Sequence, residues 1–345
     1  MRTLSKIVAC WMALLSLTAC DNRESQDTAG EVNLYSSRHY DTDLALYDDF
    51  TRDTGIQVNR IEAGADELIA RIQSEGESSP ADLLITVDAG RLWRAEQAGI
   101  FQAVDSAVLT ERLPDNMRHP EGLWIGLSKR ARVIVYNREA GLPTPLADYT
   151  DLADPTHAGK VCIRSSSNIY NVSLMASIVA HLGEAAAESW AEGVVRNFAR
   201  TPQSNDTGQI RAVASRECQI AVVNTYYLAR LAASDDPADL AVAAAVGIVF
   251  PGQQGNGTHV NISGAGVVST SPNRDNAIRF LEYLTSDRAQ SLFADGNNEY
   301  PAVPSVGASS KVAALGEFKE DGLSATELGV HQSTAIMVFD RAGWQ

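Results

Sequence analysis

Several of the ten tyrosines in this chain stand where a predicted strand gives way to a helix. The polar segments that follow these strands place tyrosine beside Ser, Thr, Asn or His: Ser36 to Asp41 with Tyr40, Ser165 to Tyr170, and Asn224 to Tyr227 with Tyr226. In open α/β sheets ligands bind at the carboxyl ends of the strands, and helix N-termini there favour negative charge. We therefore expect Tyr40, Tyr170, Tyr226 and Tyr227 to gather at one site in which phenolate is favoured over phenol.

Clustered phenols suit a particular kind of ligand. A tyrosine titrates at about pH 10, so ionising several of them at neutral pH requires a strong compensating cation. Zinc and copper prefer thiolate and imidazole, whereas calcium and magnesium take carboxylates and carbonyls. The sequence has no Asp-rich loop of the EF-hand kind. Phenolate oxygens instead suit a hard trivalent ion, and Fe³⁺ is the abundant one in an oxidising compartment.

Strands and helices alternate along the body of the chain, which is typical of an α/β fold. Strands are predicted at 32–35, 56–60, 81–87, 129–136, 160–163 and 219–223, and helices at 42–54, 65–76, 274–284 and 286–294. The Ala/Val run at 241–246 is interpreted as a further strand entering Gly247 to Phe250. The length of the body exceeds what one hydrophobic core usually organises, so two lobes are expected.

The N-terminal segment has the pattern of an export signal. Arg2 and Lys6 precede an apolar stretch from Ile7 to Ala19 that is too short to anchor a protein across a bilayer. The stretch leads into Leu17-Thr18-Ala19-Cys20, which resembles a bacterial lipoprotein signal. We expect residues 1–20 to form the lipoprotein signal peptide, with cleavage before Cys20 and acylation of its thiol.

Residues 21–30 follow as a polar tether. Asp21, directly after the lipidated cysteine, resembles the signal for retention at the inner membrane of Gram-negative bacteria. Loss of the signal moves the formal charge from −15 to −17, because it carries two basic residues and no acidic one. A protein with this much negative charge is not expected to bind nucleic acid, because the phosphates are bound by clustered Lys and Arg.

Cysteine usage fits export as well. Cys10 leaves with the signal and Cys20 is the predicted lipid site, so the body keeps only Cys162 and Cys218. Two cysteines in an exported protein favour one disulfide. Each lies eight residues before a tyrosine of the expected site, Cys162 before Tyr170 and Cys218 before Tyr226. The bridge would bring both tyrosine loops to one edge of one lobe.

Four segments together resemble the ferric-ion-binding periplasmic proteins, and in particular the tyrosine-rich subgroup found in cyanobacteria and several proteobacteria. They are Val32 to Tyr40, Asn224 to Tyr227, His259 to Gly266 and Gly296 to Pro301. The resemblance runs from about residue 31 to the C-terminus. It implies an α/β fold of the two-lobed periplasmic binding protein type, each lobe a mixed, mostly parallel sheet flanked by helices and joined to the other by hinge strands.

The resemblance also implies a ligand set. Carried over by position, it names Tyr40, Tyr170, Tyr226 and Tyr227 as phenolate ligands of Fe³⁺, with His39 as a ligand or a near neighbour. Many members of the family place a glutamate ligand where this chain has Val87, one residue before Asp88, so no carboxylate is expected from this loop. Carbonate or water would complete the coordination.

Arg230 is the expected charge partner behind these ligands. It follows Tyr226 and Tyr227 by four and three residues on one predicted helix, hence on their face, and four phenolates exceed the charge of Fe³⁺ by one. Four other arginines close to the strand ends are expected to be solvated or lobe-bridging charges: Arg38, Arg130, Arg132 and Arg164.

The expected architecture divides the chain into interleaved lobes. The first holds residues 31–131 and 256–305, and the second 132–255 and 306–345. Closure of the lobes around Fe³⁺ would be a hinge motion, followed by delivery to an ABC permease and its ATPase. We expect a monomer in the periplasm, held to the inner membrane by its lipid.

Two other functions stay open on the sequence alone. A binding protein of this fold could take an organic or anionic solute such as a sugar phosphate, with tyrosines as stacking walls and Arg38 and Arg164 as anion contacts. An exported enzyme is the weaker alternative, because the chain has no G-x-S-x-G, H-E-x-x-H or C-x-x-C motif. We expect a protein that is not an enzyme.

Overall fold

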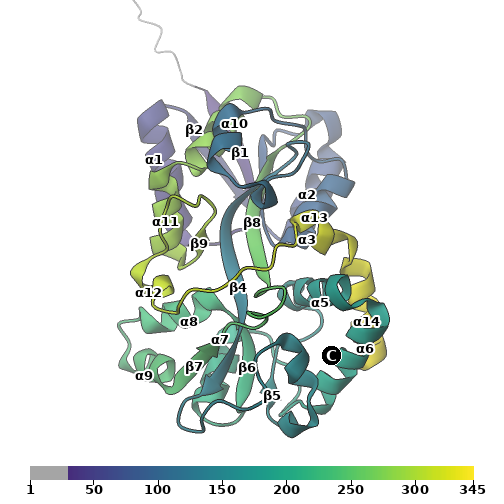
Figure 1. The fold of residues 1–345 in the computed structure, drawn as a ribbon. Helices are drawn as coiled ribbons and strands as arrows, with labels where there is room; N and C mark the ends of the chain where they lie inside the picture. The colour runs from purple at the N-terminus through teal and green to yellow at the C-terminus, as the bar shows by residue number, and fades with distance from the viewer. Residues whose placement is uncertain (1–29) are drawn as a thin grey trace, which may run out of the picture.

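The computed structural model describes residues 30–345, which form two lobes joined in the middle (Figure 1). The strands are β1 (Glu31–Ser36), β2 (Gln57–Glu62), β3 (Leu83–Val87), β4 (Ile125–Asn137), β5 (Val161–Cys162), β6 (Ile220–Asn224), β7 (Val246–Val249), β8 (Val260–Val267) and β9 (Tyr300–Pro301). The helices are α1 (Leu44–Thr54), α2 (Ala65–Glu75), α3 (Ala89–Gln97), α4 (Ala107–Arg112), α5 (Ile169–Leu182), α6 (Glu184–Arg196), α7 (Asp206–Ala214), α8 (Thr225–Ala232), α9 (Pro237–Ala245), α10 (Arg274–Leu284), α11 (Asp287–Asn297), α12 (Ser310–Ala313), α13 (Ala325–Val330) and α14 (Gln332–Ala342).

One sheet continues through both lobes, in the order β2-β1-β3-β8-β4-β6-β5, with β7 and β9 paired to β4. Parallel pairs lie towards its two ends, where β1 pairs with β2 and β3, and β5 pairs with β6. The long strand β4 is antiparallel to its neighbours and changes partner along its length. It pairs with β8 as far as Ala131 and with β6 from Arg132 onwards. The lobes are therefore joined by continuous sheet as well as by chain crossings.

The strands that lead to the site are apolar and buried. β3 (Leu83–Val87) and β6 (Ile220–Asn224) are buried along their whole length. A strand covered by helices on both faces has no polar alternation, and this accounts for their continuous apolar runs. Polar residues are found at the end of each strand, because the chain leaves the sheet there and faces the space between the lobes.

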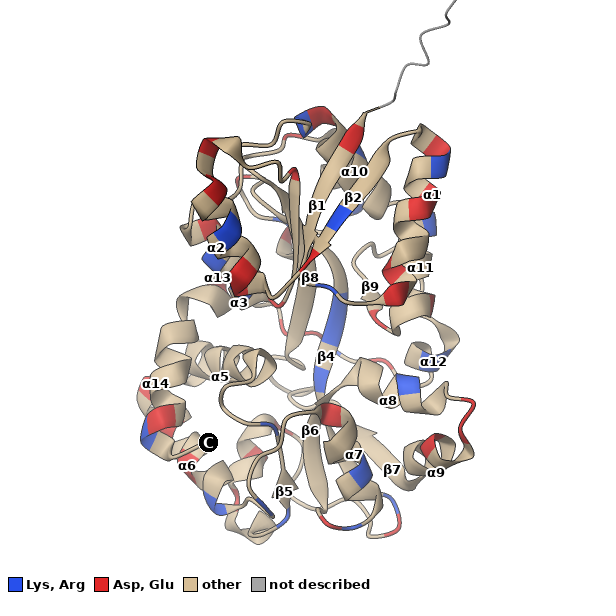
Figure 2. Cartoon of the chain, turned by 180° about the vertical axis from the view of Figure 1, so that it is seen from behind, with Lys and Arg blue, Asp and Glu red and all other residues tan. Residues whose placement is uncertain are grey.

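Each lobe has its own hydrophobic core. In the first, Phe50 packs against Phe280 with ring centroids 4.8 Å apart, among residues of β1, β3, β8 and the helices around them. In the second, two clusters lie on opposite faces of the sheet. One contains Trp190 and Trp344, and the other contains both cysteines of the body. Figure 2 shows acidic residues spread over the outer helices, whereas basic residues mark the middle of β4.

Two parts of the chain differ from the sequence prediction. The Ala/Val run at 241–246 is helical up to Ala245, in α9, because Pro237 opens a helix that the Asp236 side chain caps and alanine favours helix strongly. The tail 306–345 is divided between the lobes. Ala325 and Leu328 of α13 lie in the first core, whereas α14 packs into the second.

Within the described residues, no helix combines the length and the apolar character that a bilayer crossing requires. The predicted signal peptide 1–20, its lipidation site Cys20 and nearly all of the tether 21–30 lie outside the part of the chain that the structure describes.

Candidate metal centre

Tyr40 comes from the first lobe. β1 ends at Ser36, and the chain then passes over the sheet edge, where the Ser37 amide donates to the Ile85 carbonyl at 2.9 Å. Tyr40 stands directly before the short 3₁₀ turn Asp41–Asp43 that leads into α1. Burial is the main cause that raises the pKa of this phenol, and the nearby Glu299 carboxylate raises it further.

Tyr170 comes from the second lobe, at the start of α5. Asn168 caps this helix, accepting a hydrogen bond from the Tyr170 amide at 3.2 Å. Asn171 holds the preceding loop by donating to the Arg164 carbonyl at 2.7 Å. The Trp344 indole donates to the same carbonyl at 3.1 Å, so the loop is also fixed by the C-terminal segment.

Tyr226 and Tyr227 come from the second lobe as well, in the first turn of α8 directly after β6. Their rings lie 4.2 Å apart between centroids, and Tyr226 donates to the phenol oxygen of Tyr170 at 3.5 Å. Tyr226 is buried and Tyr227 half-buried. Burial is the main cause that raises the pKa of both phenols. The ionised form of Tyr170 would raise both pKa values further, and that of Tyr40 would raise the pKa of Tyr226.

The structure thus brings together all four tyrosines that the sequence singled out, from three strand-to-helix junctions. Burial is the main cause that raises the pKa of Tyr40, Tyr226 and Tyr227, and nearby negative groups raise these pKa values further. Without a cation these three phenols therefore stay protonated at neutral pH. A bound metal ion reverses this balance, because each phenol then becomes a ligand on losing its proton.

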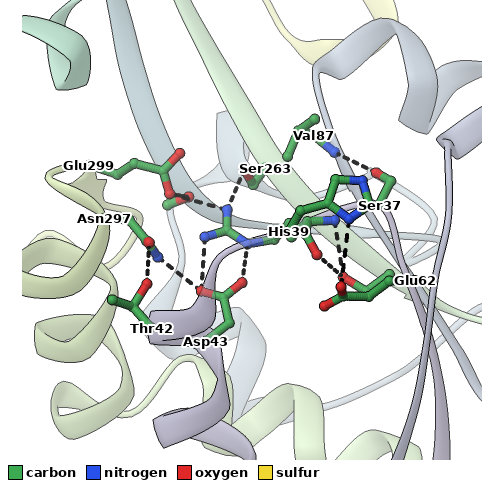
Figure 3. Close-up of polar contacts among 12 residues, drawn as sticks. Ser37, His39, Thr42, Asp43, Glu62, Val87, Ser263, Asn297 and Glu299 are labelled. Carbon is green, nitrogen blue, oxygen red and sulfur yellow. Dashed lines mark hydrogen bonds and ion pairs between the residues drawn. The ribbon is translucent and has the colours of Figure 1, made fainter.

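His39 lies at the rim rather than among the phenols. Its side chain is 58 % exposed, and its Nδ1 atom lies 3.7 Å from the Glu62 carboxylate of β2. Figure 3 shows the ring beside Glu62. His39 nonetheless lines the same cavity of about 290 Å³ as Tyr40 and Tyr170.

Arg38 is buried, which corrects the expectation of a solvated or lobe-bridging charge. Its Nε donates to the Asp43 carboxylate at 2.7 Å, and its Nη1 to Ser263 Oγ at 2.7 Å and Glu299 at 3.1 Å (Figure 3). The guanidinium carbon lies 4.7 Å from the centre of the Tyr40 ring. Arg38 therefore fixes the Tyr40 loop through a saturated ion-pair network within the first lobe.

Arg130 and Arg132 are also buried, which excludes solvated charges, and both lie on β4, the strand that passes through both lobes. Arg130 donates from Nη1 to Ser263 at 3.0 Å, whereas its Nε and Nη2 have no hydrogen-bond partner among the described residues. Its guanidinium carbon lies 5.5 Å from the centre of the Tyr170 ring. Sequence reasoning missed Arg130 as a site residue. Its position on a strand whose basic residues face the junction of the lobes was the available signal.

Arg132 and Arg164 serve the tyrosine loops of the second lobe. Arg132 binds Asp206 at 2.7 Å and Asn171 at 2.8 Å, which ties β4 to the start of α5. Arg164 is largely buried, and its guanidinium carbon lies 5.4 Å from the centre of the Tyr170 ring. Arg164 therefore also belongs to the surroundings of the site, which the sequence did not predict.

Arg230 lies where the helical spacing predicted. Its guanidinium carbon is 5.8 Å from the centre of the Tyr226 ring and 5.9 Å from that of Tyr227. A cation at this distance from two aromatic rings is attracted to them, and more strongly to a phenolate. Arg230 is exposed, so it reaches the pair from the solvent side of α8.

The loop after β3 offers no free carboxylate. Val87, the last residue of β3, has an apolar side chain. The next residue, Asp88, accepts hydrogen bonds from Gly90 and Ser173 on one oxygen and from Asn261 on the other. More broadly, within residues 30–345 no group of three or more His, Cys, Asp and Glu gathers to hold a metal ion. Phenol oxygens are the donors this cleft presents.

The two cysteines of the body form a disulfide, with Cα atoms 5.9 Å apart. Cys162 ends β5, and Cys218 comes shortly before β6, which is parallel to β5 and adjacent to it. The bridge therefore joins the two strands whose following loops carry Tyr170 and Tyr226.

Two lobes that share a sheet and enclose a polar site between them define a solute-binding protein of the class that closes on its ligand. Over residues 78–318 the chain matches the bacterial extracellular solute-binding proteins, and it belongs to that family.

Its relatives narrow the comparison. The chain is 53% identical to iron uptake protein A1 of Synechocystis sp., over 92% of this chain and 89% of that protein. It is 55% identical, with a TM-score of 0.88, to the structure of IdiA (FutA) of Trichodesmium in complex with iron and citrate ligands, over 92% of this chain and 100% of that one. Apo FutA2 from Synechocystis is 53% identical with a TM-score of 0.86, over 91% and 99% of the two chains.

Proposed function

We propose that this protein binds Fe³⁺ between its lobes through the phenolates of Tyr40, Tyr170, Tyr226 and Tyr227. The single observation that carries the proposal is the convergence of these four phenols at the junction of the lobes. The similarity to an iron uptake protein and to a structure that contains iron supports the same ligand.

Fe³⁺ fits the donor set better than other abundant metal ions. Phenolate is a hard, anionic oxygen donor, and a trivalent hard cation compensates it most strongly. Four phenolates around Fe³⁺ carry one excess negative charge. Arg130, buried with two nitrogens that have no hydrogen-bond partner among residues 30–345, and Arg230, over the rings of Tyr226 and Tyr227, can compensate it. Arg38 is already neutralised by Asp43 and Glu299.

In this proposal His39 stays outside the set of iron ligands, as its exposure and its position beside Glu62 support. Water or a small anion such as carbonate fills any coordination position that the phenolates leave open. Asp88 does not contribute, because hydrogen bonds occupy both of its carboxylate oxygens.

The biological role we propose is capture of Fe³⁺ in the periplasm and its delivery to an ABC permease and its ATPase. We place the division of the lobes near residues 131 and 256, with α13 assigned to the first lobe on its packing. We propose that a lipid on Cys20 holds the monomer to the inner membrane. Replacement of Cys20 by Ala should release the protein into the periplasmic fraction and abolish incorporation of labelled palmitate.

The decisive test adds ferric citrate to purified protein that has been stripped of metal. Binding by phenolates gives a visible phenolate-to-iron charge-transfer band. The double variant Tyr226→Phe with Tyr227→Phe removes two of the four donors and should lose the band. The variant Tyr136→Phe, on β4 outside the site, serves as control and should keep it.

Absence of a band in the unmodified protein would overturn the proposal. A thermal shift caused by an organic anion such as a sugar phosphate, in the presence of a metal chelator, would then favour the organic-solute alternative.

A further inference from the structure

Asp88 is a buried residue with an unusual backbone. It stands between β3 and α3 with φ 92° and ψ 129°, and its side chain is completely buried. A non-glycine residue with positive φ is uncommon and persists where surrounding contacts hold it. The Asp88 amide donates to the Ile262 carbonyl at 2.8 Å, and the carboxylate makes further contacts.

The Asp88 carboxylate bonds to three separate parts of the molecule. It accepts from the Gly90 amide at 2.9 Å, which caps α3, and from Asn261 Nδ2 of β8 at 2.7 Å. Its third partner is Ser173 Oγ at 2.7 Å. Ser173 belongs to α5 of the second lobe and lies three residues after Tyr170. This bond therefore crosses directly from one lobe to the other.

The surroundings orient the Ser173 hydroxyl towards Asp88. Gln332 of α14 donates to Ser173 Oγ at 3.2 Å, and the single hydroxyl proton is then directed to the carboxylate. Gly90 permits the close approach of α3 to α14. A Cβ atom built on Gly90 would lie 1.7 Å from Gln332 Nε2 and 2.1 Å from its Cδ.

We propose that Asp88 and Ser173 form a latch that holds the two lobes together over the bound ion. The bond joins the two lobes directly, so any opening that moves α5 away from α3 would break it and expose the carboxylate of Asp88. Closure of the latch and capture of the ion favour the same state, and each therefore strengthens the other. Ser173 is a positioning residue in this account, because it acts on the ion through α5 and Tyr170.

The latch assigns a role to the loop after β3, which carries Asp88. The resemblance to ferric-binding proteins placed a carboxylate ligand at the position of Val87. Here the carboxylate stands one residue later and joins the lobes instead. The inference rests on the proposed iron binding and adds to it the pair of residues that retains the ion.

The test measures how fast iron leaves the protein. Iron-loaded protein is mixed with excess chelator, and the loss of the visible band is followed in time. Ser173→Ala removes the crossing bond but leaves Asp88 as the cap of α3. Because hydrogen bonds to charged groups contribute substantially, release should be about tenfold faster. Ser189→Ala is the control in the same lobe. Its hydroxyl donates to the Ala185 carbonyl within α6, at 3.1 Å, and release should stay at the wild-type rate.

Gln332→Ala tests the latch independently. It removes the donor that directs the Ser173 hydroxyl to Asp88, so the loaded protein should release iron faster. If Ser173→Ala does not fold, Gln332→Ala decides the question in the same way. Wild-type release by the folded variants would overturn the latch. A wild-type protein that forms no band at all would instead overturn the proposed iron binding.

Discussion

The two sides of the cleft are built differently. The first lobe brings a single phenol, Tyr40, on a loop fixed by the ion pairs of Arg38 with Asp43 and Glu299. The second lobe brings the other three phenols on two neighbouring loops, whose parent strands are joined by a disulfide. Three of the four proposed donors thus lie in one lobe, and the fourth comes from the other lobe.

This difference suggests an order of events. An ion can first meet Tyr170, Tyr226 and Tyr227, which need no lobe movement to assemble. Tyr40 then completes the set from the opposite side, and its loop brings Arg38 with it. The second lobe should therefore dominate recognition of the ion, whereas the first lobe should dominate its retention.

The largest effect on iron binding is expected when donors are removed from each lobe in turn. Tyr226→Phe with Tyr227→Phe should abolish the binding that produces the charge-transfer band, since only Tyr170 and Tyr40 remain of the four donors. Tyr40→Phe should keep a band of lower intensity but release iron faster, because three donors persist without the closing one. Affinity measured by competition with citrate, together with the spectrum, checks both. If both variants lost the same affinity and band intensity, the proposed difference between the lobes would be wrong.

Dependence on pH should come next in size. Burial raises the pKa of Tyr40 and Tyr226, so these phenols are protonated in the metal-free protein and must release protons on binding. Affinity should therefore fall as pH falls, by about tenfold per pH unit for each proton released. Titrations between pH 8 and pH 6 measure the slope.

The slope of iron affinity against pH also distinguishes the two lobes. Tyr40→Phe should reduce this slope by the contribution of one proton. Where residual binding can be measured, the double variant of Tyr226 and Tyr227 should reduce it by more. A slope of zero in the wild-type protein would show that neutral phenols, or other groups, hold the ion.

Removal of Arg130 should have a smaller effect. Arg130→Gln leaves the four phenols in place but removes a buried positive charge beside the Tyr170 ring. Loss of an outer partner of a metal site typically lowers affinity by roughly 10- to 100-fold. The exposed arginine of the Arg196–Glu192 pair provides the control, since Arg196→Gln should leave affinity unchanged. An unaltered affinity for Arg130→Gln would remove it from the site.

Opening the disulfide should change iron affinity least and stability most. The Cys162→Ser, Cys218→Ser double variant loses a crosslink that spans 56 positions, which corresponds to about 4 kcal/mol of unfolding free energy in the chain-entropy model. Denaturant titration measures that loss. The loops of Tyr170 and Tyr226 keep their strand pairing and their contacts with Arg132, so the band should persist. Loss of the band in folded protein would make the bridge part of the binding mechanism.

The gathering of Tyr40, Tyr170, Tyr226 and Tyr227 was predictable from sequence because it follows from a rule about strand ends. Each tyrosine lies in the segment between a strand and the first turn of the next helix, and the carboxyl ends of such strands meet at one edge. The disulfide was predictable because only two cysteines remain in the body of an exported protein. Local order along the chain sufficed for both.

The arginines were not predictable in this way. The burial of Arg38 depends on Glu299, which lies 261 residues away, and the open donors of Arg130 depend on which residues of both lobes surround it. The tail was misassigned for a similar reason. Helices α13 and α14 are consecutive, but the apolar faces of each find a core in a different lobe. The strand predicted at 241–246 was wrong for a local reason. Asp236 and Pro237 are a helix-start signal that the sequence already contained.

The bond from the Trp344 indole to the Arg164 carbonyl has a practical consequence for work with the purified protein. An affinity tag or fluorescent fusion added after Gln345 would pull on the loop that carries Tyr170. The iron affinity measured with such a preparation would include the effect of the tag. The reporter is better inserted at an exposed turn remote from the phenols, such as Gly141, where the backbone already turns and added residues meet open space.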